Sequence, residues 1–237
     1  MGDGSAATPM GALALVLLLL QFATDVALAP ALVPLAQQRR HFPLFVGTVQ
    51  LVSLLLYDAC LVSGTDRIFI RSVEWHFISD VLSLTYALLV IVHLAAEENE
   101  EIAMTLRYLA FFSSWITKYR DAWNSVVFEV ALTVAYLAYA AWSHVAHPRR
   151  RGQFRSNHVH RAAGSGAFGF VLFAAAQLTS RYGSVGLRRV MPPFLLCLAH
   201  IVLGFASFEA WLSLPSPAHR AKKLDAAGAH MPTAAFV

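Results

Sequence analysis

Charged residues are scarce in this sequence. Asp, Glu, Lys and Arg make up 14% of the 237 residues and hydrophobic residues make up 57%, whereas soluble domains usually carry roughly 25% charged residues. This scarcity excludes an ordinary soluble domain. The net charge of +4 does not indicate nucleic-acid binding, because the basic residues cluster beside apolar blocks, as they do on the cytoplasmic flanks of membrane helices.

Cysteine is scarce as well. Cys60 and Cys197 both lie within apolar blocks, which excludes a disulfide scaffold and favours buried thiols. A nucleotide site is also excluded. The glycine-rich run at 164–169 matches a dinucleotide fingerprint, but it opens an apolar segment and follows no strand. Its small residues Ser165 and Gly169 favour close packing against a neighbouring helix.

What the sequence does contain is long apolar blocks. A helix needs about twenty residues to cross the roughly 30 Å of bilayer hydrocarbon. Blocks of this kind are predicted as helices over residues 12–36, 43–63, 74–96, 102–117, 123–146, 162–180 and 190–214. Because the connections are short, neighbours should pack antiparallel. The predicted fold is all-α, a bundle of seven transmembrane helices.

The block boundaries define the predicted organisation. Residues 1–11 are a short N-terminal segment, 12–214 the membrane domain, and 215–237 a disordered cytoplasmic tail rich in Pro, Ala and basic residues. Lys and Arg favour the flanks on the C-terminal side of the membrane, which predicts an N-out, C-in orientation. The alternative for the first block is a cleaved signal peptide, but no basic region precedes it.

Four ionisable side chains stand inside apolar blocks: Asp58, His76, Asp80 and His200. An ionisable group in hydrocarbon costs at least ~2.5 to 3.5 kcal/mol on insertion scales, so such groups usually face the bundle interior and carry function. In the N-out orientation all four fall in the outer half of the membrane. His76 and Asp80 share a helix face, and Cys197 shares one with His200.

These residue types point to a metal centre. A hydrolytic zinc site needs three protein ligands and an open position for water. The candidate ligands are Asp58, His200 and either Cys197 or His76, and Asp80 is the candidate that orients or deprotonates the water. The alternative is that these side chains are hydrated or hydrogen-bonded in the core and bind no metal.

Short motifs give the chain a family resemblance. They are Tyr57-Asp58-Ala59-Cys60, Asp80-Val81-Leu82-Ser83, Arg120-Asp121-Ala122-Trp123-Asn124 and Ala199-His200-Ile201-Val202-Leu203. With them, roughly residues 20–216 resemble the myomaker and transmembrane-protein-eight family. That family belongs to the seven-helix superfamily that includes alkaline ceramidases and adiponectin-type receptors.

The resemblance implies a zinc site near the outer face. Its ligands would be one histidine of the second helix and two of the seventh, with a serine and an aspartate beside the metal-bound water. Such a site cleaves lipid amides in the superfamily enzymes, whereas the myomaker branch remodels membranes in cell fusion. By position, Asp80 matches the aspartate and His200 the second histidine of the seventh helix.

Other positions depart from the family pattern. Asp58 stands at the second-helix histidine, Leu196 at the remaining histidine, and Leu54 at the serine, with Ser53 one residue away as the candidate catalytic serine. Aspartate is a competent zinc ligand but leucine is not, so two of the three ligands are left. Cys197 points about 100° around the helix from position 196. Cys197 can replace that ligand only if the helix is turned about its axis or begins at a different residue. Pro192 and Pro193, just upstream, make a shifted start conceivable.

The favoured function is therefore a membrane-organising or lipid-interacting protein with a degenerate outer-leaflet metal site. The alternative is a zinc-dependent hydrolase of a lipid amide or ester bond, with Zn²⁺ as cofactor. Proton-coupled transport is the weakest prediction, because His93 lies toward the inner end and no inverted repeat is evident. Expected partners are the lipid bilayer and a lipid substrate or ligand, with no nucleic acid and no nucleotide. The sequence leaves the organelle and the protein partners open.

Overall fold

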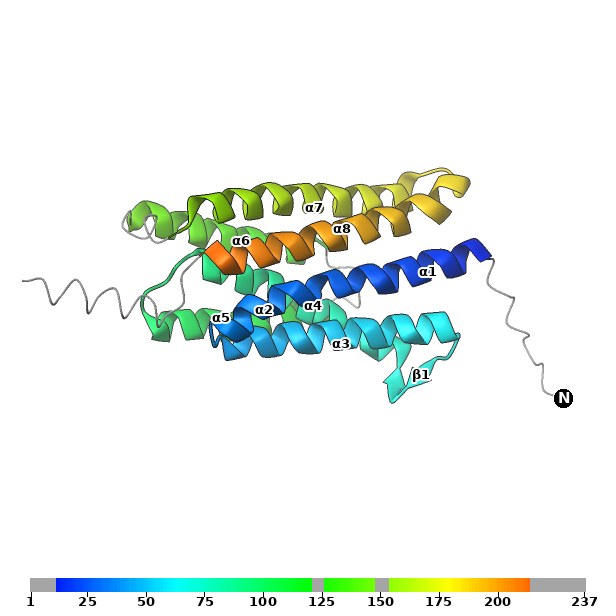
Figure 1. The fold of residues 1–237 in the computed structure, drawn as a ribbon, viewed down its shortest axis with the longest axis horizontal. Helices are drawn as coiled ribbons and strands as arrows, with labels where there is room; N and C mark the ends of the chain where they lie inside the picture. Colours follow the sequence, from blue (N-terminus) through cyan, green and yellow to red (C-terminus); the bar gives the residue numbers. More distant parts are fainter. Residues whose placement is uncertain (1–11, 121–125, 148–153, 214–237) are drawn as a thin grey trace, which may run out of the picture.

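The computed structural model describes residues 12–120, 126–147 and 154–213, which form a bundle of long helices (Figure 1). The elements are α1 (Ala12–Asp25), the 3-10 helix η1 (Val26–Ala31), α2 (Leu32–Gln37), α3 (His41–Ser63), β1 (Arg67–Ile68), β2 (Ile70–Arg71), α4 (Ser72–Leu94), α5 (Glu100–Arg120), α6 (Val126–Ala146), α7 (Ser156–Tyr182) and α8 (Val185–Ser213). The predicted N-terminal segment 1–11 and the tail 215–237 lie outside the described residues.

The predicted helical bundle is confirmed, and each apolar block is helical where it is described. The only departure from an all-α fold within the described residues is the antiparallel pair β1–β2, which turns at Phe69, where φ is 65°. Helix α8 begins before Pro192 and contains it together with Pro193. The helix therefore begins earlier than the predicted residue 190. Both prolines lie beyond the first turn of α8, so the carbonyls four residues before them lack a backbone donor there.

The sequence predicts one continuous helix over residues 12–36, but the structure divides this block into α1, η1 and α2. Its middle, η1, is wound as a 3-10 helix that contains Pro30, and α2 follows with Pro34. Neither proline has an N–H to donate to the carbonyl four residues earlier, so the α-helical ladder is interrupted twice within a few residues. The three segments α1, η1 and α2 still follow one another along the bundle and pack beside α3 and α8 (Figure 1).

Five helical segments are long and apolar enough to cross a membrane: Leu15–Gln37, His41–Ser63, Ser72–Leu94, Asn157–Tyr182 and Met191–Ser213. Such lengths match the hydrocarbon thickness of a bilayer. These segments fit an integral membrane protein. Helices α5 and α6 do not meet the same criterion within the described residues.

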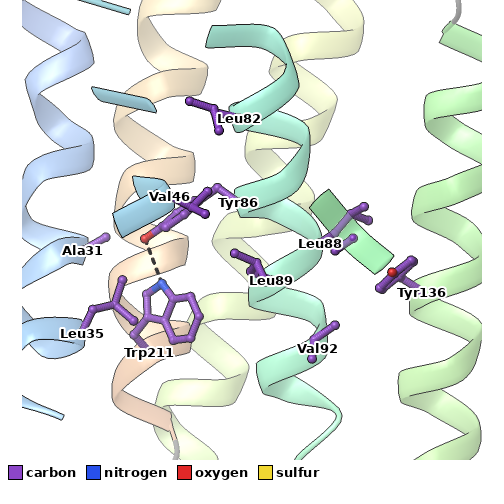
Figure 2. Packing of buried hydrophobic residues seen from close by; sticks show 11 residues of the cluster. Ala31, Leu35, Val46, Leu82, Tyr86, Leu88, Leu89, Val92, Tyr136 and Trp211 are labelled. Carbon is purple, nitrogen blue, oxygen red and sulfur yellow. Dashed lines mark hydrogen bonds between the residues drawn. The ribbon is translucent and has the colours of Figure 1, made fainter. Parts of the chain in front are cut away.

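The bundle has two distinguishable ends, and β1–β2 marks one of them, called the hairpin end below (right in Figure 1). At the opposite end the apolar core includes Trp211 of α8, which is 1% exposed (Figure 2). Its indole Nε1 donates a hydrogen bond to the Tyr86 hydroxyl at 2.9 Å, and its carbonyl accepts one from Gln38 Nε2 at 2.9 Å. The His93 ring lies 4.5 Å from the Trp211 ring, centroid to centroid. Trp211 thus joins α8 to α4 and to the end of α2.

Replacing Trp211 by phenylalanine is expected to lower the free energy of unfolding by about 1 to 3 kcal/mol, because the buried Tyr86 hydroxyl loses its donor. The measurement is the thermal midpoint of purified protein, with the folded fraction that remains after heating determined by size-exclusion chromatography. Trp142→Phe is the matched control, since Trp142 is 60% exposed on α6. Equal midpoints for the two variants would contradict a role for the Trp211 hydrogen bond.

Candidate functional site

The interface between α1 and α8 contains the first group of polar residues. His200 Nδ1 makes an ion-pair contact with Oδ1 of Asp25, a residue with no exposed surface. One turn toward the start of α8, the Cys197 side chain interacts with Thr24. One turn further along, Gly204 lies against the backbone of Ala27. Positions 197, 200 and 204 share one helix face, so a single face of α8 meets α1 where α1 passes into η1.

Helix α3 adds Asp58 to this group. Asp58 is fully buried, its carboxyl group interacts with that of Asp25, and its Oδ1 accepts a hydrogen bond from Gln21 Nε2 at 3.5 Å. Oδ2 of Asp25, Oδ2 of Asp58 and Oγ of Ser53 are buried without a hydrogen-bond partner in the described part of the chain. Two carboxylates in contact disfavour ionisation of both unless a positive charge compensates them. His200 is the group placed to supply one.

A second polar cluster lies near the hairpin end, between α4, α5 and α6. Lys118 of α5 is 8% exposed, and its Nζ lies 2.5 Å from Glu129 Oε1 of α6 and 3.3 Å from Asp80 Oδ2 of α4. His76 Nδ1 lies 3.7 Å from the same Asp80 oxygen. The Tyr57 ring meets the His76 ring edge-on at 4.8 Å. Tyr57 precedes Asp58 in α3, so it lies between the two clusters.

The structure therefore separates the predicted site residues into two groups. Asp58, His200 and Cys197 gather around Asp25, while His76 and Asp80 gather around Lys118. Ser53 is 1% exposed on α3, the helix that carries Asp58. Across the described ranges, no three His, Cys, Asp or Glu side chains are grouped so as to hold a metal ion. The zinc site implied by the family resemblance remains a prediction.

Asp80 and His200, the two residues that the resemblance predicts at functional positions, each contact a side chain of another helix. His200 is in contact with Asp25, and Asp80 with Lys118. Both contacts pair an acidic with a basic side chain of another helix, and both lie where α-helices meet inside the bundle. Contacts of this kind join helices, and breaking one is most costly where it is buried. Asp25 has no exposed side-chain surface, whereas the Asp80 side chain is 34% exposed, so the contact of Asp25 with His200 should contribute more.

Two residues of these clusters were missed by sequence reasoning. Asp25 lies in the middle of the first apolar block, and an acidic residue at such a position is a signal by the same rule that singled out Asp58. Lys118 was counted among flanking charges, since it lies near the end of its block. Nothing in the sequence shows that its side chain turns inward.

Comparison with known proteins assigns the chain to a family. No protein with a curated description matches the chain. A family model described as "Protein of unknown function (DUF3522)" matches residues 13–185, which is well over half of the chain. The match includes Asp25, Asp58, Asp80 and Lys118, and it ends where α8 begins, before His200. The chain belongs to the DUF3522 family.

Proposed function

We propose that this chain is a membrane-organising, lipid-interacting protein with seven transmembrane helices, oriented N-out and C-in, in which the outer polar residues hold helices together and perform no hydrolysis. One observation carries the proposal. The two residues that match functional positions of the family it resembles, Asp80 and His200, each contact a side chain of the opposite acid–base type on another helix.

The exposed faces of α5 and α6 support seven spans. On α5, Phe112 and Ile116 are 59% and 63% exposed, and on α6, Val127 and Val145 are 77% and 69% exposed. Large apolar side chains in such numbers at the surface of both helices are unfavourable in water and suited to lipid. The positive charge of Lys118 does not argue against a span for α5, because Glu129 and Asp80 neutralise it.

The proposal is tested with purified full-length protein in vesicles of phosphatidylcholine and ceramide. We expect the wild type to increase lipid mixing between vesicles while neither lipid is cleaved, as measured by mass spectrometry of the lipid extract. Asp80→Ala should lower the yield of folded protein, because the buried Lys118 ammonium group loses one of its two carboxylate partners. Glu74→Gln is the control, since Glu74 forms an exposed ion pair with Arg71. If Asp80→Ala stays folded and loses a lipid-cleaving activity of the wild type, the proposal is wrong.

A zinc-dependent hydrolase of a lipid amide or ester is the second candidate, and the unpartnered oxygens of Asp25, Asp58 and Ser53 favour it. Its ligands would have to come from Asp25, Asp58 and His200, which lie together but are not grouped in the described structure so as to hold a metal ion. A bound Zn²⁺ would polarise the lipid carbonyl and activate water. Metal analysis separates the candidates. Close to one equivalent of zinc, lost in both His200→Ala and Asp25→Ala, would favour the hydrolase, and a small content unchanged by either variant would exclude it.

A further inference from the structure

The β1–β2 hairpin holds a bulky aromatic residue in a strained conformation at its turn. Phe69 has a φ of 65° and is 81% exposed. A large side chain in the left-handed region is costly, and such strain persists only where the surroundings fix the backbone. Two contacts fix it here: Trp75 Nε1 of α4 donates a hydrogen bond to the Ile68 carbonyl at 2.7 Å, and Ser72 Oγ donates one to Asp66 Oδ1 at 2.9 Å. The hairpin is therefore held against the start of α4, while its apolar turn residue stays outside the protein core.

Two arginines flank this turn. Arg67 and Arg71 are opposite each other in the register of the hairpin, a position in which like charges repel. Arg71 is compensated, because its Nη2 lies 3.1 Å from Glu74 Oε1. Arg67 forms no ion pair within the described ranges, and its Nε donates a hydrogen bond to the Phe69 carbonyl at 3.4 Å. Asp66, next to it in the sequence, accepts a hydrogen bond from the start of α4 instead. The Arg67 guanidinium group is therefore placed to bind an anion from outside the chain, and phosphate suits its geometry.

A groove adjoins the arginine pair. It lies between α4 and α5, has a volume of about 410 Å³, and is lined by Val73, Glu74, Phe77, Ile78, Trp115 and Tyr119. Ligand sites commonly have volumes of this order and walls that are mostly apolar. Glu74 is the one charged residue of the lining, and its carboxylate is the one that binds Arg71. Trp and Tyr are typical of the headgroup level in membrane proteins. The groove is thus suited to an apolar chain whose polar end lies at the arginines.

We propose that the hairpin end binds an anionic phospholipid of the adjoining leaflet, with its phosphate at Arg67 and Arg71, an acyl chain in the groove between α4 and α5, and Phe69 inserted beside it into the same leaflet. The hairpin projects from the side of the bundle and not beyond the helix ends, so it lies where that leaflet would be (Figure 1). Transfer of Phe69 from water to lipid compensates for the strain at its backbone. The inference rests on the membrane-spanning bundle proposed above, and it holds for either orientation of that bundle.

The depth of the hairpin is measured with a fluorescent label in full-length protein reconstituted into vesicles. Phe69→Cys takes the label selectively, because the two native cysteines are buried. We expect quenching by phosphatidylcholine brominated near the glycerol end of its acyl chains, and protection from iodide in the water. Val52→Cys on α3 is the control for hydrocarbon, and Glu98→Cys, in the exposed connection between α4 and α5, is the control for water. If the label at position 52 is not quenched by lipid, the membrane-spanning bundle is wrong. If it is quenched and position 69 behaves like position 98, only the hairpin inference is overturned.

The headgroup and the groove are tested separately by titrating purified full-length protein with phosphatidylglycerol that carries a fluorescent acyl chain. Arg67→Gln should weaken binding about five-fold, the usual effect of one basic residue on an anionic lipid. Val73→Trp should also weaken it, because the larger side chain fills the groove. Arg181→Gln, which removes an exposed charge from the last turn of α7, is the matched control and should bind like the wild type. Wild-type affinity in either Arg67→Gln or Val73→Trp, or an equal loss in Arg181→Gln, would overturn the inference.

Discussion

Replacing Gly204 by alanine is expected to be among the most damaging single changes in this bundle. A Cβ at this position would lie 2.4 Å from the carbonyl oxygen and 2.9 Å from the carbonyl carbon of Ala27. Both atoms belong to the backbone of η1, so no side chain can rotate away. Forcing a methyl group into a packed core typically costs about 1 to 3 kcal/mol. We expect a value at or above the top of that range, because α8 and η1 must separate along the whole contact.

The control for Gly204→Ala is Gly164→Ala. Gly164 also lies within a helix, α7, but an added Cβ there has no heavy atom within 4 Å. Alanine is a better helix former than glycine by about 1 kcal/mol, so this variant should be as stable as the wild type or more stable. Thermal midpoints of both variants, measured by size-exclusion chromatography after heating, make the comparison. Similar losses in the two variants would mean that the close approach of α8 to η1 does not matter for stability.

The close approach lies within η1, the part of the first block in which Pro30 interrupts the α-helical ladder. The carbonyl of Ala27 meets α8 there at Gly204, a residue without a side chain. Four residues earlier on the same face of α8, His200 contacts Asp25. Gly204 therefore sets the distance between the two helices, and this distance allows the His200 side chain to reach the carboxylate.

Hydropathy and length were sufficient to predict most of the fold. A block of apolar residues about twenty long has few structural alternatives in a bilayer, so every predicted block is helical where it is described. The interruption of the first block was not predicted, although Pro30 and Pro34 are visible in the sequence. Proline can be accommodated in a transmembrane helix by local 3-10 adjustment, and composition alone does not show where that happens.

The pairing of the polar residues was the part that sequence reasoning could not supply. The energetic cost of ionisable groups in hydrocarbon identified Asp58, His76, Asp80 and His200 correctly as residues within helices. Which of them meet depends on the rotation of each helix about its axis and on its neighbours. Asp25 and His200 come from opposite ends of the chain, and only the packing of α1 on α8 brings them together.

The contact between Asp25 and His200 leads to the second large effect. Asp25→Ala leaves the His200 ring without its carboxyl partner, and His200→Ala leaves the buried carboxyl groups of Asp25 and Asp58 in contact without the imidazole. Breaking a buried ion pair from one side costs about 3 to 5 kcal/mol. Each single variant should therefore be strongly destabilised, and His200→Ala more so, because two carboxyl groups then remain in contact.

A double-mutant cycle measures this coupling directly. If the two side chains stabilise each other, the variant with both replacements should lose less than the sum of the single losses, by about 0.5 to 3 kcal/mol. The control is the exposed pair Arg71 and Glu74, whose side chains are 65% and 44% exposed. Replacing both with glutamine removes the charges but keeps a side-chain acceptor for the backbone N–H of residue 71, so the thermal midpoint should stay unchanged, since solvent screens exposed pairs. Additive losses at Asp25 and His200 would show that the contact is incidental. A coupling of the expected size would instead show that the contact between Asp25 of α1 and His200 of α8 stabilises the packing of the first helical segment on the rest of the bundle.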